Sequence, residues 1–190
     1  MIFEGRVWRH VPANAHPLNF EYLITAKGRW NRRGQYGCLY TALTPESVIA
    51  EYRRVLERRG IHGRRDLVAL EVRIDPVFDL VTTLKQPETR LTGREGTIDL
   101  RIKANDPRLI GDSEDDLEFC RTIADVVRER GHYAVLAPSA ASQAGRVLAI
   151  YPENKPDRIL IHLAAPRLQL NYGPDPLIDE LGHLRRPVPE

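Results

Sequence analysis

Apolar and polar residues alternate most regularly from Asp66 to Asp75, which predicts a half-buried β-strand. The same reading gives a second strand over Val77 to Leu84. Shorter apolar runs predict five further strands, at Arg6–His10, Cys38–Leu43, Tyr133–Ala137, Val147–Tyr151 and Ile159–Leu170. Residues 11–27 read as an irregular connection, and residues 86–111 as short helices with loop.

Two helices carry clear start and stop signals. Thr44 offers an N-cap hydroxyl before Pro45, which predicts a helix from there to about Arg59 that ends at Gly60. Ser113 caps a second helix, which runs to Arg130 and is closed by Gly131. The predicted apolar stripe of that helix is Leu117, Cys120, Ile123, Ala124 and Val127.

Strands dominate this pattern, and the helices come singly rather than in a regular βαβ alternation. The expected fold class is therefore α+β, with antiparallel or mixed sheets and a few flanking helices. A chain of 190 residues, 42% of them hydrophobic, suits one domain with one core, which we place at about residues 5–170. Residues 171–190 are rich in proline and are expected to form a surface arm.

The charge pattern narrows the range of partners. Lysine occurs at four positions, so 24 of the 28 basic residues are arginine. Guanidinium groups bind phosphate bidentately, although a GC-rich genome would also enrich arginine. Acidic and basic residues are interleaved, and no recognition helix with a basic face is evident, so we expect no direct nucleic-acid binding.

The protein is expected to be cytoplasmic. Cys38 and Cys120 match no metal or redox spacing, which favours two reduced, buried thiols and no metal site. We see no signal peptide and no stretch long enough to cross a membrane. The motifs of Rossmann dehydrogenases, P-loop NTPases, α/β-hydrolases and zincins are also missing.

Glu51 is the first candidate for chemistry. On the helix that begins at Pro45, it lies about 100° from the centre of the apolar stripe, at the edge of the buried face. A carboxylate there can be partly desolvated beside a cleft. The plainer interpretation is an ion pair with Arg54, Arg58 or another surface arginine.

A loop bracketed by Gly28 and Gly34 supplies the next candidates. It holds Arg29, Trp30, Asn31, Arg32 and Arg33. Glycines let the backbone approach a ligand closely, and guanidinium groups are planar hydrogen-bond donors. Such a loop can hold a pyrophosphate. The alternative is an exposed arginine-rich loop, anchored on the core by Trp30.

Two further side chains suit ligand binding. Tyr40, on a short apolar strand, can stack a nucleobase or a nicotinamide ring, or donate its hydroxyl to a sugar, unless it is simply part of the core. Ser139, at the end of the strand Tyr133–Ala137, can hydrogen-bond a ligand or merely cap a turn. No histidine is spaced to activate it as a nucleophile.

Together these residues resemble the signature of the RES domain family, which is named for an arginine, a glutamate and a serine. The matching segments are Gly28-Arg29-Trp30-Asn31, Leu39-Tyr40-Thr41-Ala42, Glu51 and Pro138-Ser139. The resemblance spans roughly Gly5 to Leu163. Ser142 competes with Ser139 for the serine position.

The resemblance implies an ADP-ribosyltransferase-like fold and a toxin of a type II toxin–antitoxin pair. Such toxins degrade NAD, as substrate rather than cofactor, by hydrolysis or phosphorolysis of the nicotinamide–ribose bond. Some relatives instead transfer ADP-ribose to a protein. The usual partner is a helix-turn-helix (Xre-type) antitoxin that blocks the active site and assembles with the toxin into a larger complex. A non-catalytic protein that only binds the regulator is a third possibility.

The expected roles follow from the chemistry of NAD. Nicotinamide leaves as a neutral molecule, so one carboxylate facing the oxocarbenium-like transition state suffices, and we assign that role to Glu51. Arg29 would hold a phosphate, with Arg33 as a helper, and Tyr40 would stack the nicotinamide. Ser139 would hydrogen-bond the ribose or the amide. Trp30 and Asn31 complete the expected substrate contacts.

Overall fold

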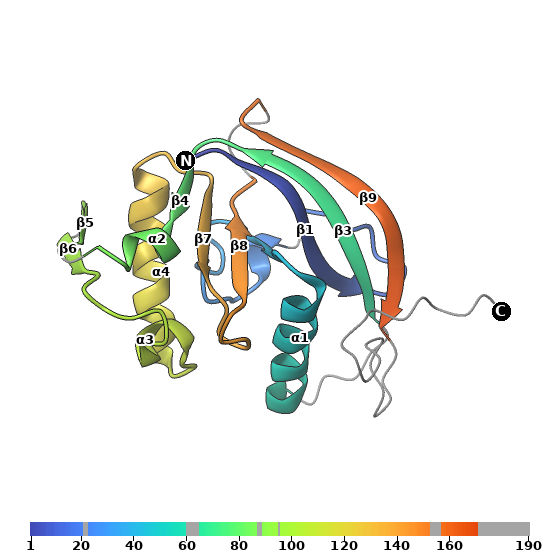
Figure 1. Cartoon of the computed structure of the whole chain (residues 1–190), viewed down its shortest axis with the longest axis horizontal. Coiled ribbons are helices and arrows are strands. Elements are labelled where there is room, and N and C mark those ends of the chain that lie inside the picture. The colour runs from blue at the N-terminus through green and yellow to red at the C-terminus, as the bar shows by residue number, and fades with distance from the viewer. Residues whose placement is uncertain (21–22, 60–64, 87–88, 95, 153–156, 171–190) are drawn as a thin grey trace.

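A computed structural model describes residues 1–20, 23–59, 65–86, 89–94, 96–152 and 157–170. One seven-stranded sheet organises these residues, in the order β4-β7-β8-β2-β1-β3-β9 (Figure 1). The strands are β1 (Phe3–Pro12), β2 (Leu39–Ala42), β3 (Arg65–Ile74), β4 (Val77–Asp79), β7 (Ala134–Pro138), β8 (Arg146–Ile150) and β9 (Ile159–Leu170). β4 and β7 pair in parallel, and the other pairings in this sheet are antiparallel. The mixed sheet confirms the α+β prediction.

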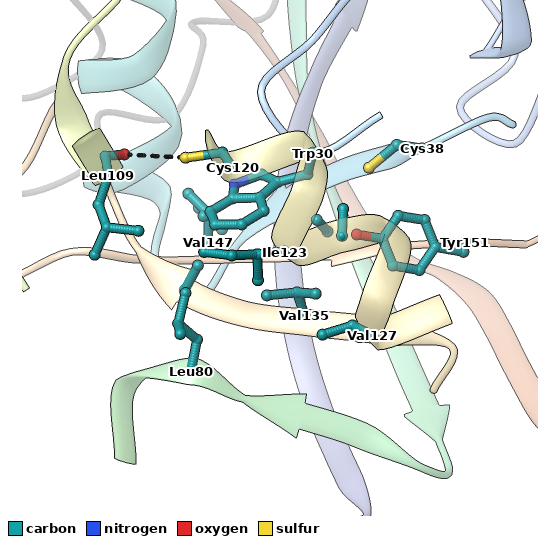
Figure 2. Packing of buried hydrophobic residues seen from close by; sticks show 14 of the residues in the cluster. Trp30, Cys38, Leu80, Leu109, Cys120, Ile123, Val127, Val135, Val147 and Tyr151 are labelled. Carbon is teal, nitrogen blue, oxygen red and sulfur yellow. Dashed lines mark hydrogen bonds between the residues drawn. The ribbon is translucent and has the colours of Figure 1, made fainter. Parts of the chain in front are cut away.

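Side chains alternate along each strand, so each face of the sheet contributes residues to a buried cluster. On one face, Val135 and Ala149 join a cluster with residues of the helices α1 (Pro45–Arg59) and α4 (Glu114–Glu129). On the other face, Leu136 and Leu148 pack with Leu23 of the short 3-10 helix η1 (Leu23–Thr25), which lies in the connection predicted to be irregular. The first cluster includes Trp30 and both cysteines, which are buried and form no disulfide, as expected (Figure 2).

The helix signals are confirmed. The backbone N–H of Ser47 donates to Oγ1 of Thr44 at 3.2 Å, so Thr44 caps α1 as predicted. At α4, Ser113 and Asp116 form a reciprocal capping box. Gly131 follows with a φ of 78°, a left-handed conformation that glycine adopts without steric cost. The predicted stop at Gly60 lies outside the described residues.

Three sequence predictions were wrong or incomplete. The strand expected over Val77–Leu84 ends at Asp79, whose carboxylate accepts the N–H of Thr82 at 2.9 Å and caps the short helix α2 (Leu80–Thr83). Residues 86–111 contain the expected short helix, α3 (Pro107–Ile110), but also an unpredicted hairpin of β5 (Arg90–Gly93) and β6 (Gly96–Asp99). β3 is not half-buried in its first part, because Asp66 to Leu70 are buried on both faces of the sheet.

The proline-rich tail falls outside the described residues. No helix among those described is both long enough and apolar enough to cross a membrane.

Candidate functional site

A cavity of about 710 Å³ opens between β1, β2, α1 and the start of α4. Its lining includes Arg29, Trp30, Tyr40 and Glu51, so the three side chains predicted to carry the chemistry share one cavity. Its volume is in the range typical of small-molecule sites. Ser139 lies immediately behind this surface, between the lining residues Pro138 and Ala140.

Glu51 is held by the loop that follows β7. Its Oε1 accepts the Ser139 hydroxyl at 2.6 Å and the backbone N–H groups of Ala140 and Ala141 at 3.1 and 3.3 Å. The alternative of an ion pair with Arg54 is not seen, since Arg54 binds Asp112 instead, and the side chain of Arg58 lies outside the described structure. Among the described side chains and amides, the donors that hold Glu51 are neutral, and they orient the carboxylate without an opposite charge.

Ser139, rather than Ser142, makes the contact with Glu51. It is 4% exposed, and its Oγ also accepts the backbone N–H groups of Ala141 and Ser142 at 3.2 and 3.1 Å. Ser142 contributes a backbone carbonyl that accepts the N–H of Gly145. The hydroxyl of Ser139 therefore shapes the loop and orients Glu51 at the same time.

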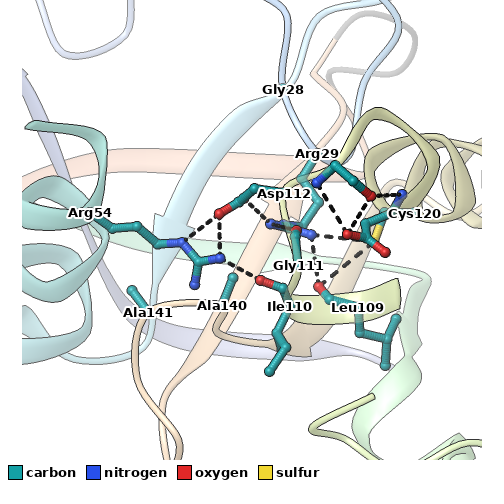
Figure 3. A network of polar contacts seen from close by, with 12 residues as sticks. Gly28, Arg29, Arg54, Leu109, Ile110, Gly111, Asp112, Cys120, Ala140 and Ala141 are labelled. Atoms are coloured by element: carbon teal, nitrogen blue, oxygen red, sulfur yellow. Dashed lines mark hydrogen bonds and ion pairs between the residues drawn. The ribbon is translucent and has the colours of Figure 1, made fainter. Parts of the chain in front are cut away.

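Arg29 is fixed by the turn between α3 and α4 (Figure 3). Its guanidinium donates to the carbonyl of Leu109 at 2.9 Å, to that of Gly111 at 2.6 Å and to Oδ1 of Asp112 at 2.8 Å. Arg54 donates to Oδ2 of the same carboxylate through its Nε at 3.1 Å. One aspartate thus holds two arginines of the cavity, and neither Arg54 nor Asp112 was among the predicted site residues.

Tyr40 holds the glycine-bounded loop through its hydroxyl. The oxygen accepts the backbone N–H of Trp30 at 2.7 Å, and the hydroxyl donates to Oδ1 of Asn31 at 2.9 Å. A Cβ on Gly28 would lie 2.1 Å from this oxygen, so only glycine fits there. Burial raises the pKa of Tyr40 well above its usual value and keeps the hydroxyl neutral.

The other predicted contacts divide between core and surface. Trp30 is 1% exposed and packs in the core, as the anchoring interpretation expected (Figure 2). Asn31 is fully buried and also donates to the carbonyl of Ala26 at 2.7 Å. Arg33 is exposed and does not line the cavity, whereas Arg32 pairs with Glu118 and Asp125 on α4.

The cavity lining carries more positive than negative charge. Among the described residues of the lining, six side chains are cationic (Arg9, Lys27, Arg29, Arg54, Arg65 and Arg121), and three are carboxylates (Glu51, Asp112 and Glu114). His10 adds no charge at neutral pH, because burial and the nearby Arg65 and Arg9 lower its pKa to about 3. Among the described residues, no group of three or more metal-binding side chains could hold a metal ion. The chemistry of this lining suits a polyanionic ligand.

Residues 6–172 match the RES domain family, which is most of the chain. The chain belongs to the RES domain family. No curated protein matches it at a significant level. Among solved structures, it resembles a chain in the crystal structure of the M. tuberculosis MbcT–MbcA toxin–antitoxin complex. The TM-score is 0.55 and the identity 16%, over 88% of this chain and 85% of that one. At this identity the likeness establishes the fold alone.

Of the three residues expected to match the family name, Arg29 and Glu51 line the cavity, and Ser139 lies between the lining residues Pro138 and Ala140 in the sequence. Glu51 and Ser139 form a direct pair, whereas Arg29 belongs to a separate cluster around Asp112. Helical geometry indicated that Glu51 could lie beside a cleft, but the sequence gave no sign that the α3–α4 region holds Arg29. The sequence did offer one sign that Arg54 belongs to the site: it follows Glu51 by one helical turn and so lies on the same face of the helix.

Proposed function

We propose that this RES domain cleaves the nicotinamide–ribose bond of NAD. The observation that supports the proposal most is the setting of Glu51, a carboxylate held by a hydroxyl and two amides inside a cavity with excess positive charge. Such a site attracts the phosphates of a dinucleotide while it keeps one negative charge for the sugar cation that develops as nicotinamide leaves.

The proposed chemistry needs few groups. Glu51 stabilises the oxocarbenium-like transition state, and Ser139 with the following amides keeps its carboxylate in position. No general acid is required, because the pyridinium leaving group departs neutral. Arg29, fixed by Asp112 and two carbonyls, frames the phosphate end of the cavity. The ring of Tyr40 bounds the nicotinamide end. The acceptor of ADP-ribose is water or phosphate.

We propose further that the protein is the toxin of a type II toxin–antitoxin pair and acts in the cytoplasm. A fold like that of a chain from a toxin–antitoxin complex supports this role, and two buried cysteines that form no disulfide suit a reducing compartment. Its partner would be a helix-turn-helix (Xre-type) protein that covers the cavity in a larger assembly. Such a protein, encoded beside this chain, should co-purify with it and suppress NAD loss.

Mass spectrometry of NAD products tests the reaction directly. Purified protein is incubated with NAD, with and without phosphate and then with lysate. Free nicotinamide with ADP-ribose or its 1-phosphate supports the proposal and identifies the acceptor. ADP-ribose attached to lysate proteins would instead indicate mono-ADP-ribosyltransfer. No NAD loss at high protein concentration, together with tight binding of the regulator, would indicate a non-catalytic binding protein.

A further inference from the structure

Arg121 is a buried cation that the proposed mechanism does not use. It lies on α4, lines the cavity and is 4% exposed. Its Nε donates to the carbonyl of Gly28 at 3.0 Å and its Nη1 to Oε1 of Glu114 at 2.6 Å. Nη2 is buried with no hydrogen-bond acceptor in reach among the described residues. A buried guanidinium nitrogen without an acceptor is uncommon and calls for an explanation.

The surroundings of Arg121 suggest an anion. Lys27 also lines the cavity, and its Nζ lies 3.1 Å from the other oxygen of Glu114. Two cations therefore share a single carboxylate, and that carboxylate belongs to a side chain that is 62% exposed. An ion pair with so exposed a carboxylate contributes little and gives way readily to a stronger anion. A diphosphate carries more charge than a carboxylate and has more acceptor oxygens.

The contrast with Arg29 sharpens this assignment. Arg29 already donates to two carbonyls and to Asp112, so a ligand would have to compete with several fixed acceptors. Arg121 keeps an unused nitrogen, and its one carboxylate partner within 3 Å is the exposed Glu114. Its Nε bond to Gly28 also places it against the backbone of the loop that Tyr40 holds.

We propose that Arg121 and Lys27 form the diphosphate subsite of the cavity, and that Glu114 occupies it when no ligand is bound. The ligand class is a nucleoside diphosphate group. The identification of that ligand as part of NAD rests on the proposed function. Phosphate oxygens replace the carboxylate of Glu114 at both cations and supply the acceptor that Nη2 lacks. This assigns the phosphate contact to a helix residue about ninety positions beyond the loop that the sequence indicated.

Calorimetric binding of ADP, inorganic pyrophosphate and adenosine to the full chain tests the subsite. Arg121→Gln should weaken ADP binding at least tenfold and leave adenosine binding within twofold of wild type. Lys27→Met should weaken ADP binding several-fold, while Lys85→Met, at an exposed lysine away from the cavity, should not. Glu114→Gln should tighten pyrophosphate binding about threefold or more, because it removes the competing carboxylate.

Asp115→Asn is the matched control for Glu114→Gln. It removes an equal charge from the same exposed first turn of α4, but Asp115 does not line the cavity. Equal tightening by both variants would indicate a general charge effect and overturn the subsite. Because Arg121 is buried, thermal melting accompanies its variant, and Glu114→Gln and Lys27→Met decide the matter if Arg121→Gln unfolds.

NAD turnover in the same preparations separates this proposal from the previous one. A protein that cleaves NAD but binds ADP equally well with and without Arg121 overturns the subsite and keeps the function. A protein that binds ADP through Arg121 but leaves NAD intact keeps the subsite and overturns the function. Failure of the wild-type protein to bind ADP and pyrophosphate overturns the subsite outright.

Discussion

Two clusters in the lining of the cavity hold their charges in opposite ways. Glu51 is an anion held by neutral donors, a hydroxyl and two backbone amides. In the second cluster, Arg29 and Arg54 are cations held by the carboxylate of Asp112 (Figure 3). Neutral donors orient an ion and leave its charge available, whereas an opposite charge orients it and cancels part of its field. The first arrangement suits a group that must face a developing cation, and the second suits a rigid frame.

We expect the largest effect from Glu51→Gln, which tests whether the charge of Glu51 is needed for catalysis. Glutamine keeps the shape and a carbonyl oxygen for the Ser139 hydroxyl but removes the negative charge. We expect NAD turnover to fall by at least about 100-fold because the transition-state cation loses its counter-charge. Product formation over time, with circular dichroism to check folding, measures the effect.

Glu57→Gln provides the control for that experiment, since Glu57 is exposed on the same helix and does not line the cavity. It should turn over NAD at the wild-type rate. Near-normal turnover by a well-folded Glu51→Gln protein would remove Glu51 from the mechanism.

Asp112→Asn tests the second cluster. Without the carboxylate, two partly buried guanidinium groups, 12% and 25% exposed, face each other with no shared counter-charge. We expect a loss of about 2 kcal/mol in the free energy of unfolding, which urea titration measures. Asp115→Asn, at an exposed position of the next helix, should stay within about 0.5 kcal/mol of wild type. Equal stability of the two variants would show that Asp112 does not organise this cluster.

Burial of His10, together with the positive charges of Arg65 and Arg9, lowers its pKa and predicts a pH effect on stability. Its folded pKa of about 3 is below the ordinary 6.5, so between these values the unfolded chain binds more protons than the folded one. The resulting stability is present above pH 6.5 and is lost as the pH falls. Between pH 7 and 5 we expect the wild-type protein to lose up to about 2 kcal/mol more than His10→Gln.

Urea titrations at both pH values provide the measurement. His132, whose pKa burial also lowers, is present in both proteins and cancels in the difference. Parallel losses in the two proteins would mean that His10 titrates normally and that the cavity does not hold it neutral.

The sequence predicted those parts of the structure whose signals are local. Thr44 with Pro45 and Ser113 with Gly131 located both long helices within about one residue, because caps and stops act on neighbouring backbone groups. Glu51 was placed at a cleft by helical geometry alone. The strand predicted beyond Asp79 was wrong because a single capping carboxylate turned the chain into a helix.

What the sequence could not reveal depends on contacts between distant segments. Arg29 meets Asp112 across more than eighty residues, and Arg121 meets Gly28 across more than ninety. No periodicity or spacing encodes such pairs. For the same reason the sequence could not show that Trp30 and Asn31, predicted as ligand contacts, are almost completely buried, although Trp30 still contributes to the cavity lining. Burial of a loop residue depends on what packs over it, and here that includes α4.

The smallest effect we predict comes from the serine beside Glu51. Ser139→Ala removes the 2.6 Å hydrogen bond to Oε1, but the amides of Ala140 and Ala141 remain to hold the carboxylate. We therefore expect kcat/KM for NAD to fall about tenfold, equivalent to about 1.4 kcal/mol. Ser142→Ala should stay within about twofold because its hydroxyl makes no such bond. A larger loss at Ser142 than at Ser139 would mean that the loop rearranges when substrate binds and that neutral donors other than those seen here hold Glu51 during the reaction.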